Sequence, residues 1–471
     1  MNLISNAKWN TFSQLFKILA QLINIVYISK IISPSDYGLM AIALVFTNLA
    51  NLLRDLGTSA SLIQTRNLNN NLINSVFWFN LILGIGLAVL LCMLSPVISF
   101  FYSEHKLIPI LCLLSLTFPL SSVATAHLAL LERKSMFRCI SIIEIISSVI
   151  SLIFAIFLAC SGYGVYSLVF QAIVLNLCSS ILFGFFSKWI PSPRVFIDWG
   201  EIRKIFKFSS NLAGFNLINY FSRNMDSFLI GKFMNPSILG VYSLAYRIML
   251  FPLQSLTFVM SRSLYPILSN HQDNNSLIRF NYFKCVFYVL SISFPVMTLL
   301  SIFSSQVIIT FIGSKWLMTG LILHWLAPTA IIQSFLSTTG SVFTAKGRTD
   351  ILFKLGCFGA FIQVAGFLIG INFDIFIFSK IYLLTNIINF FPVTVMLLKV
   401  IDANWRDLLH KIMPITISTI AMLALYFLFI SSRITEYNNI YSCIFSSIIM
   451  LLFYSLCLFI TLRGFKRFKW H

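Results

Sequence analysis

Charged side chains are scarce in this 471-residue chain. Only 10% of the residues are charged, whereas 58% are hydrophobic. A soluble domain is closer to a quarter charged, so there are too few polar groups here to cover a water-soluble fold of this size. The composition therefore excludes a soluble protein. Lipid must surround most of the side chains, and the sequence predicts an all-α integral membrane protein.

Acidic residues are rarer still, with 14 Asp and Glu against 33 Lys and Arg, which gives a formal net charge of +19. In a soluble protein this excess would indicate nucleic acid. Here the basic residues lie between apolar runs, so no nucleic acid partner is expected. We expect them to set the topology and to contact anionic membrane lipids.

Enzyme and metal motifs are also lacking. The nine Cys form no C-x-x-C pair and most lie in or near apolar runs, where they are interpreted as small hydrophobic residues. We find no Walker A, H-E-x-x-H, G-x-S-x-G or D-x-D pattern, and no long outer loop that would house a polymerase site. We therefore expect a protein that is not an enzyme and has no cofactor or metal.

Apolar runs of about 20 residues, the length needed to span a bilayer, fill most of the chain. The first run lacks a small-residue cleavage site and is expected to remain as a span. We predict fourteen spans at residues 10–32, 39–63, 75–101, 108–131, 139–160, 165–186, 206–231, 239–261, 283–303, 317–343, 351–371, 375–398, 412–431 and 440–462.

The Lys and Arg residues favour one side of this predicted topology. Most fall at the two ends of the chain and in the even-numbered connections, whereas few lie on the other side, namely Lys30, Lys106, Lys232, Lys315 and Arg433. By the positive-inside rule, both termini are cytoplasmic. The expected location is the bacterial inner membrane.

An internal repeat divides the chain. Ser33-Pro34-Ser35-Asp36-Tyr37-Gly38 and Asn235-Pro236-Ser237-Ile238-Leu239-Gly240 share Pro, Ser and Gly at an offset of 202 residues. Six predicted spans separate the copies, so the repeat is parallel. We predict an N-terminal six-helix lobe at 1–201, a C-terminal six-helix lobe at 202–400, and two appended helices with a basic cytoplasmic tail at 401–471.

Polar residues recur at helical spacing inside several spans, where each charge is costly. In the first span the steps of 4, 3, 4 and 3 place one set on a single face: Asn10, Gln14, Lys17, Gln21 and Asn24. The seventh span has a similar face formed by Asn216, Asn219, Arg223 and Asp226. The fifth span contains Glu144 as an isolated charge.

We interpret these faces as the lining of a wet, net cationic cavity suited to phosphate or an acidic sugar. The candidate substrate-binding residues are Lys17, Gln21, Asn24, Arg54, Asn219, Arg223, Asp226 and Arg247. The candidates for ion coupling are Asp226, Glu144 and Asp55. Structural roles stay open at this point, namely an ion pair of Arg223 with Asp226, an interfacial position of Arg54 and Asp55, and snorkelling of Arg247.

The stretch from Ile31 to Gln64, which includes Arg54-Asp55-Leu56-Gly57-Thr58-Ser59-Ala60, resembles Wzx-type polysaccharide flippases. Further matching stretches begin at Leu131, Gly162 and Asn224. The resemblance implies the MATE-like fold of the multidrug/oligosaccharidyl-lipid/polysaccharide exporter superfamily, with fourteen helices in two lobes plus a C-terminal pair. Among the candidate residues, the region of Asp226 matches the family, whereas Lys17 and Arg247 are inferred from helical spacing alone.

The resemblance also implies a function. It implies undecaprenyl-diphosphate-linked oligosaccharide as cargo, moved to the periplasmic leaflet by ion-coupled alternating access, with H+ or Na+ as the coupling ion. The polysaccharide polymerase and the chain-length regulator are candidate partners. Two alternatives remain, a MATE-like small-molecule exporter, which should have an acidic cavity, and a membrane-embedded polymerase, which should have a carboxylate cluster or a large outer loop.

Overall fold

The computed structural model describes residues 3–54, 69–193, 199–269, 274–430 and 440–466, together with the single residues 62, 197 and 272. Within these ranges the chain is helical and has no β-strand. It forms two compact units, residues 1–240 and residues 241–471. Each unit is described below by itself.

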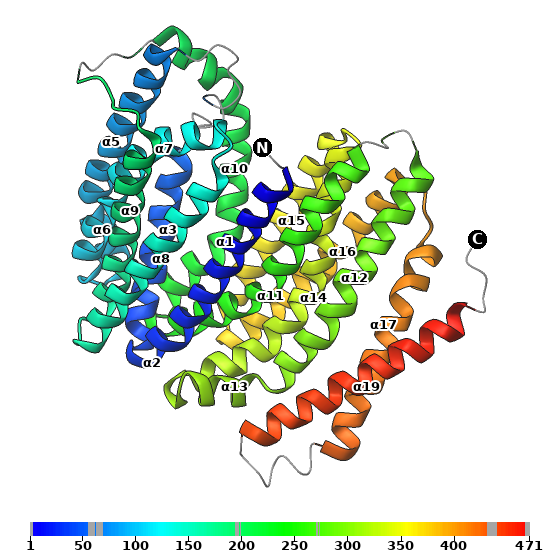
Figure 1. Cartoon of the computed structure of the whole chain (residues 1–471). Helices are drawn as coiled ribbons and strands as arrows, with labels where there is room; N and C mark the ends of the chain where they lie inside the picture. The colour runs from blue at the N-terminus through cyan, green and yellow to red at the C-terminus, as the bar shows by residue number, and fades with distance from the viewer. Residues whose placement is uncertain are drawn as a thin grey trace. The chain divides into compact units, whose positions relative to one another are not determined.

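The first unit is built from long helices that lie side by side (Figure 1). In chain order they are α1 (Leu3–Ile23), the π-helical turn η1 (Asn24–Ile28), α2 (Ser29–Ile31), α3 (Pro34–Arg54), α5 (Asn70–Tyr102), α6 (Leu107–Ser115), α7 (Thr117–Arg133), α8 (Phe137–Cys160), α9 (Val165–Ser187) and α10 (Trp199–Phe233).

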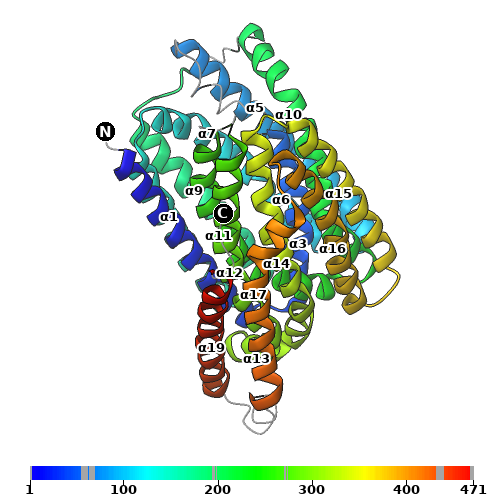
Figure 2. The same ribbon diagram turned by 90° about the vertical axis from the view of Figure 1, so that its right-hand side faces the viewer.

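The second unit packs its helices around one large apolar core, to which Tyr282, Phe335, Phe343 and Leu397 contribute. Its elements are α11 (Pro236–Ser269), α12 (Asn275–Ile302), α13 (Ser304–Phe311), η2 (Ser314–Trp316), α14 (Leu317–Ala345), α15 (Thr349–Gly370), α16 (Ile375–Val400), α17 (Trp405–Leu425), η3 (Tyr426–Ile430) and α19 (Ile440–Lys466). The appended helices α17 and α19 pack on each other at the edge of this unit (Figure 2).

Twelve helical segments among the described residues are long and apolar enough to cross a membrane. Twelve of the fourteen predicted spans coincide with them. The other two, at 206–231 and 239–261, fall on α10 and α11, which are 35 and 34 residues long. The all-helical membrane fold is confirmed, and the count of fourteen spans stays a prediction.

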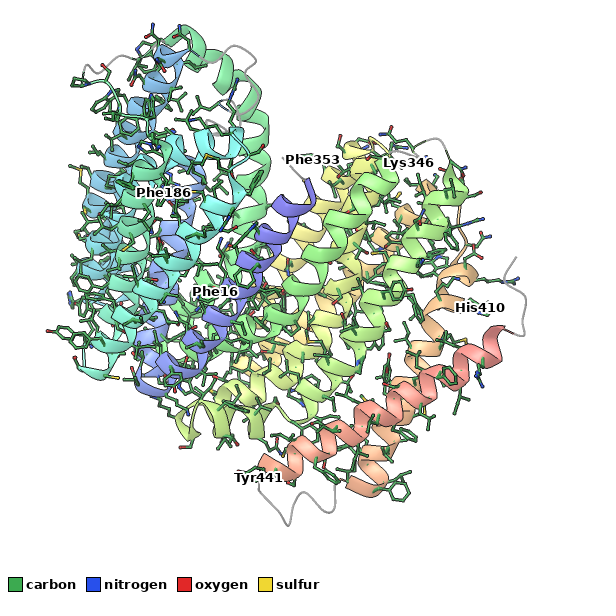
Figure 3. All side chains as sticks on the ribbon, viewed as in Figure 1. Phe16, Phe186, Lys346, Phe353, His410 and Tyr441 are labelled. Atoms are coloured by element: carbon green, nitrogen blue, oxygen red, sulfur yellow. The ribbon has the colours of Figure 1, made fainter. Side chains whose placement is uncertain are left out.

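Large apolar side chains cover the outer faces of the helices. Phe186 on α9 is 42% exposed and Tyr441 at the start of α19 is 77% exposed (Figure 3). Many Phe, Ile and Leu side chains are equally open, and in water each would forgo roughly 1.5–3 kcal/mol of burial free energy. Acyl chains are the solvent that removes this cost.

The two copies of the repeat pack against each other within the first unit. A side chain added at Gly38 would overlap the backbone carbonyl of Pro236, and one added at Gly240 would overlap the carbonyl of Pro34. The contact is thus reciprocal, as a pseudo-two-fold axis requires, and only glycine permits backbones to approach so closely. This geometry supports the predicted internal repeat.

The boundary between the two units, at residue 240, differs from the predicted lobe boundary at residue 201. The helix α10 packs on α3 and α5 of the first unit. The phenol of Tyr220 donates to the carbonyl of Val45, and Tyr102 packs edge-on against Phe228. The first unit, which is defined by packing, therefore includes α10. In the predicted repeat, by contrast, α10 is the first helix of the C-terminal lobe. The predicted lobe boundaries remain a prediction.

Candidate functional site

A charged pair joins α1 to α8 in the first unit. The ammonium Nζ of Lys17 lies 2.6 Å from Oε2 of Glu144, and the hydroxyl of Ser13 donates to the same oxygen at 2.9 Å. The side chains of Lys17 and Glu144 are 37% and 30% exposed. The pair is therefore neither sealed in the core nor fully solvated, and a lysine has two further donors beyond the one this carboxylate takes.

The pair belongs to a longer line of polar contacts between the same two helices. Nearer the N-terminus of α1, the guanidinium of Arg138 lies 5.1 Å from the ring centre of Trp9, and Ser141 donates to the carbonyl of Trp9 at 3.1 Å. These contacts hold α1 and α8 in register. Helix packing thus brings Glu144, the isolated charge of the predicted fifth span, into contact with Lys17 of the first span.

The far end of the predicted polar face of α1 contacts α9. The amide of Asn24 donates to Oε1 of Gln171 at 2.8 Å. Asn24 is also the first residue of η1, and such π turns are often found at functional sites. Gln14 and Gln21, which belong to the same predicted face, are half-buried. The side chain of Asn10 lies outside the described residues.

Arg54 ends α3 and donates to the hydroxyl of Ser121 on α7. Its side chain is half-buried and contacts another helix of the first unit. It is therefore not a fully exposed residue at the membrane–water interface. Asp55, the neighbouring candidate for ion coupling, lies outside the described residues.

The three candidates on α10 have different surroundings. Arg223 is exposed, Asn219 is half-buried, and Asp226 is buried with 3% of its surface exposed. The carboxylate of Asp226 accepts the amide of Ser227 at 2.6 Å. Between described residues, no ion pair joins Arg223 to Asp226, so the alternative of a structural pair on one helix is not supported.

Arg247 is half-buried on α11 and belongs to the second unit. The other candidates belong to the first unit. Lys17 and Glu144 meet directly, and Asn24 in η1 contacts Gln171 of α9. A single cavity shared by Lys17, Arg223 and Arg247 stays a prediction.

Sequence reasoning missed the neutral partners of these groups. Ser13, Ser121 and Gln171 each bind a candidate residue, but uncharged side chains are cheap enough inside a bundle to be common. It also missed a neutral cluster in the second unit, where Nε2 of Gln333 donates to the hydroxyl of Tyr382 at 2.7 Å. A search for amides inside the predicted spans, rather than for charges, would have found Gln171 and Gln333.

The fold is similar to those of a lipid II flippase and of MATE-family multidrug transporters. The chain superposes on the lipid II flippase MurJ, in an inward closed conformation, with a TM-score of 0.75, covering 98% of this chain and 99% of that one at 15% identity. It also matches an inward-facing multidrug transporter of the MATE family with a TM-score of 0.60, covering 81% of this chain and 94% of the other at 14% identity. At such low identity these similarities show the fold alone.

The sequence shows the family. The model of the family described as "Polysaccharide biosynthesis protein" matches residues 27–320, and the chain belongs to this family. It is 27% identical to the lipopolysaccharide biosynthesis protein WzxC of Escherichia coli, over 78% of this chain and 75% of that protein. It is also 27% identical to the teichuronic acid biosynthesis protein TuaB of Bacillus subtilis, over 74% and 73%. The resemblance to polysaccharide flippases is thereby confirmed.

Proposed function

We propose that this chain is a flippase that moves undecaprenyl-diphosphate-linked oligosaccharide units from the cytoplasmic to the periplasmic leaflet. The family and the fold support a transporter of polysaccharide precursors. The observation that carries the proposal is the partly exposed pair of Lys17 and Glu144 inside the first unit, because it offers a cation to an anionic headgroup.

Lys17 is the group proposed to take the diphosphate. Its ammonium is held by one carboxylate oxygen and is 37% exposed, so a phosphate oxygen has access to its remaining donors. Arg54, Arg223 and Arg247 are proposed as further cations along the path, since guanidinium groups match phosphate oxygens. Gln21, Asn24 and Asn219 would supply neutral hydrogen bonds.

Ion coupling is proposed to use the same pair. When phosphate takes Lys17, Glu144 loses its cation and keeps only the hydroxyl of Ser13, so proton uptake by Glu144 becomes favourable. The helix α7, which ends with Glu132 and Arg133, also packs on α8. The other elements packed on α8, namely α9 and η1, carry no Asp, Glu, Lys, Arg or His. Asp226 and Asp55 remain further candidates.

The proposed topology places both termini in the cytoplasm of a bacterial inner membrane. The distribution of Lys and Arg supports it, because the cationic connections alternate with nearly uncharged ones. Anionic lipids would contact the basic connections. The polysaccharide polymerase and the chain-length regulator are proposed as partners that receive the flipped units.

Deletion of the gene tests the proposal. We expect surface polysaccharide to disappear and lipid-linked oligosaccharide to build up inside the cell, where mass spectrometry of the lipid extract identifies its sugars. Wild-type protein and a Lys30→Ala control, which alters an exposed lysine at the end of the same span, should restore the polymer. Normal surface polymer in a clean deletion would rule the function out.

A further inference from the structure

A cluster of uncharged polar groups lies inside the second unit, where three helices meet. Nε2 of Gln333 on α14 donates to the hydroxyl of Tyr382 on α16 at 2.7 Å and to Oδ1 of Asn386 at 3.3 Å. The hydroxyl of Tyr246 on α11 lies 3.4 Å from that of Tyr382. Figure 2 shows α14 and α16 next to each other, as their packing requires. We call these four residues the neutral cluster.

Part of the neutral cluster is accessible. Tyr382 and Asn386 are 1% and 6% exposed, whereas Gln333 and Tyr246 are half-buried. Gln333 lies close to the middle of α14, a helix of 29 residues, and thus at mid-membrane depth. Within the part of the chain that the structure describes, its amide oxygen receives no hydrogen bond. Acyl chains cannot satisfy an amide oxygen, so its open side requires water or a polar ligand.

Stacked rings hold the neutral cluster in place. Tyr382 stacks on Phe367 at 5.5 Å and 27°, and Phe367 stacks on Phe378 at 5.2 Å and 7°. Tyr246 stacks on Tyr242 at 6.1 Å and 21°. Asn386 is also fixed by donating to the carbonyl of Tyr382 at 2.8 Å. Polar groups whose orientations are fixed by packing before a ligand arrives bind it at a lower entropic cost.

The composition of the neutral cluster selects the class of ligand. In the described part of the second unit the acidic residues are Asp350, Asp374, Asp402 and Asp407, and all lie at helix ends or in connections. No carboxylate is therefore present among the described residues of the cluster to bind a metal cation. Arg247 follows Tyr246 in the sequence, so it leaves α11 about 100° around the helix axis from that ring. Amides and phenol hydroxyls fit an uncharged sugar, which has many hydroxyl groups.

We propose that Tyr246, Gln333, Tyr382 and Asn386 form a recognition site for an uncharged sugar residue of the lipid-linked oligosaccharide. This inference rests on the proposed function and adds a division of roles to it. The charged groups, Lys17 of the first unit and the proposed arginines, bind the diphosphate, and the neutral cluster of the second unit recognises the glycan.

Binding of two lipids to the purified full chain tests this site. One lipid is the oligosaccharide-bearing lipid extracted from the deletion strain, and the other is undecaprenyl diphosphate without sugar. Gln333→Leu removes the accessible amide, and Tyr246→Phe removes only a hydroxyl. Gln363→Leu is the matched control, because Gln363 is a half-buried amide in the interior of α15 with no hydrogen bond among the described residues.

We expect Gln333→Leu to weaken binding of the oligosaccharide-bearing lipid about tenfold and Tyr246→Phe to weaken it about threefold. Binding of undecaprenyl diphosphate should change less than twofold, and Gln363→Leu should leave both affinities unchanged. Equal weakening of both lipids, or equal effects of Gln333→Leu and Gln363→Leu, would overturn the sugar site. If the wild-type chain binds neither lipid, the proposed function fails and the sugar site fails with it. Tyr246→Phe keeps the test valid if Gln333→Leu does not fold.

Discussion

The two units differ in the polar contacts that they make between their membrane helices. The first unit places charges inside its helices, with Lys17 against Glu144, Arg54 on Ser121 and Asp226 buried on α10. The described interior of the second unit instead joins Gln333, Tyr382 and Asn386 through neutral hydrogen bonds. The two units thus hold different polar groups in these described contacts.

Two local features recur in helices of the two units. The helices α7 and α14 both have a lysine as the C-cap residue, Lys134 and Lys346, followed by a residue of positive φ, Ser135 and Gly347. An asparagine in α9 and one in α16 each donate to the carbonyl four residues earlier at 2.8 Å. Shared caps and turns keep the fold, and the side chains facing inward are free to specialise.

Removal of the charges of Lys17 and Glu144 should have the largest effect on the comparison between the units. Lys17→Met with Glu144→Gln leaves no unpaired buried charge, so the protein should remain folded in the membrane. We expect transport to fall about a hundredfold, the consequence of losing roughly 3 kcal/mol of charge interaction with the diphosphate. Surface polymer and membrane protein are measured together.

The matched control for this double variant is Arg348→Met with Asp350→Asn, which removes an exposed ion pair from the second unit. Exposed pairs contribute little, so polymer should stay at the wild-type level. If the Lys17 and Glu144 double variant transports normally, the pair is only structural.

Substitution of the two glycines where the repeat copies touch should have the next largest effect. Gly38→Ala and Gly240→Ala each force a methyl group into a backbone carbonyl, which typically costs about 1–3 kcal/mol of folding free energy when the surroundings must shift. The two variants should be equally destabilised in a thermal unfolding assay, because the contact is reciprocal. Gly86→Ala on α5 has no atom within 4 Å of the new methyl group and should be neutral or stabilising. Unequal effects at Gly38 and Gly240 would argue against the pseudo-two-fold contact.

A single change, Glu144→Gln, should separate binding from ion coupling. The amide keeps a hydrogen-bond acceptor for Ser13 and leaves Lys17 free for phosphate, but it no longer takes up a proton. We expect transport to persist at a several-fold lower rate and to lose its response when a protonophore collapses the proton gradient. A variant that responds to the gradient as the wild type does would remove Glu144 from the coupling mechanism.

Loss of the hydrogen bond between α1 and α9 should have the smallest effect. Asn24→Ala removes the contact with Gln171, and a neutral hydrogen bond contributes about 1 kcal/mol, which corresponds to about a fivefold change in rate. Asn176→Ala on α9 is the control, because the described contact of that amide is with its own helix. Equal transport rates for the two variants would show that this contact does not matter for function.

Much of the fold follows from the sequence, since hydropathy and the positive-inside rule depend on local composition. The predicted span at 139–160, for example, corresponds to α8 at Phe137–Cys160. Helical spacing predicts that Lys17 and Asn24 share one face of the first span, and the structure shows that each contacts a neighbouring helix, α8 and α9 respectively. The pairing of Lys17 with Glu144 was out of reach, because it joins residues 127 positions apart through tertiary packing of two helices.

The neutral cluster shows a second limit. A search for costly groups finds Lys17 and Asp226 because a charge in lipid needs an explanation. Gln333 and Asn386 carry no charge, and amides and hydroxyls occur throughout this chain. Only the structure shows which of them meet, so their proposed role depends on three-dimensional contacts rather than on residue type.

The central claim is that this chain carries the lipid-linked oligosaccharide across the bilayer, and a leaflet assay tests it most directly. Proteoliposomes are loaded with the lipid extracted from the deletion strain, and an impermeant periodate reagent oxidises only the sugars on the outer face. With wild-type protein, we predict that nearly all of the lipid becomes oxidised. With the Lys17→Met and Glu144→Gln double variant, we predict that about half stays protected. Protection of half the lipid in vesicles that contain the wild-type protein would contradict the account.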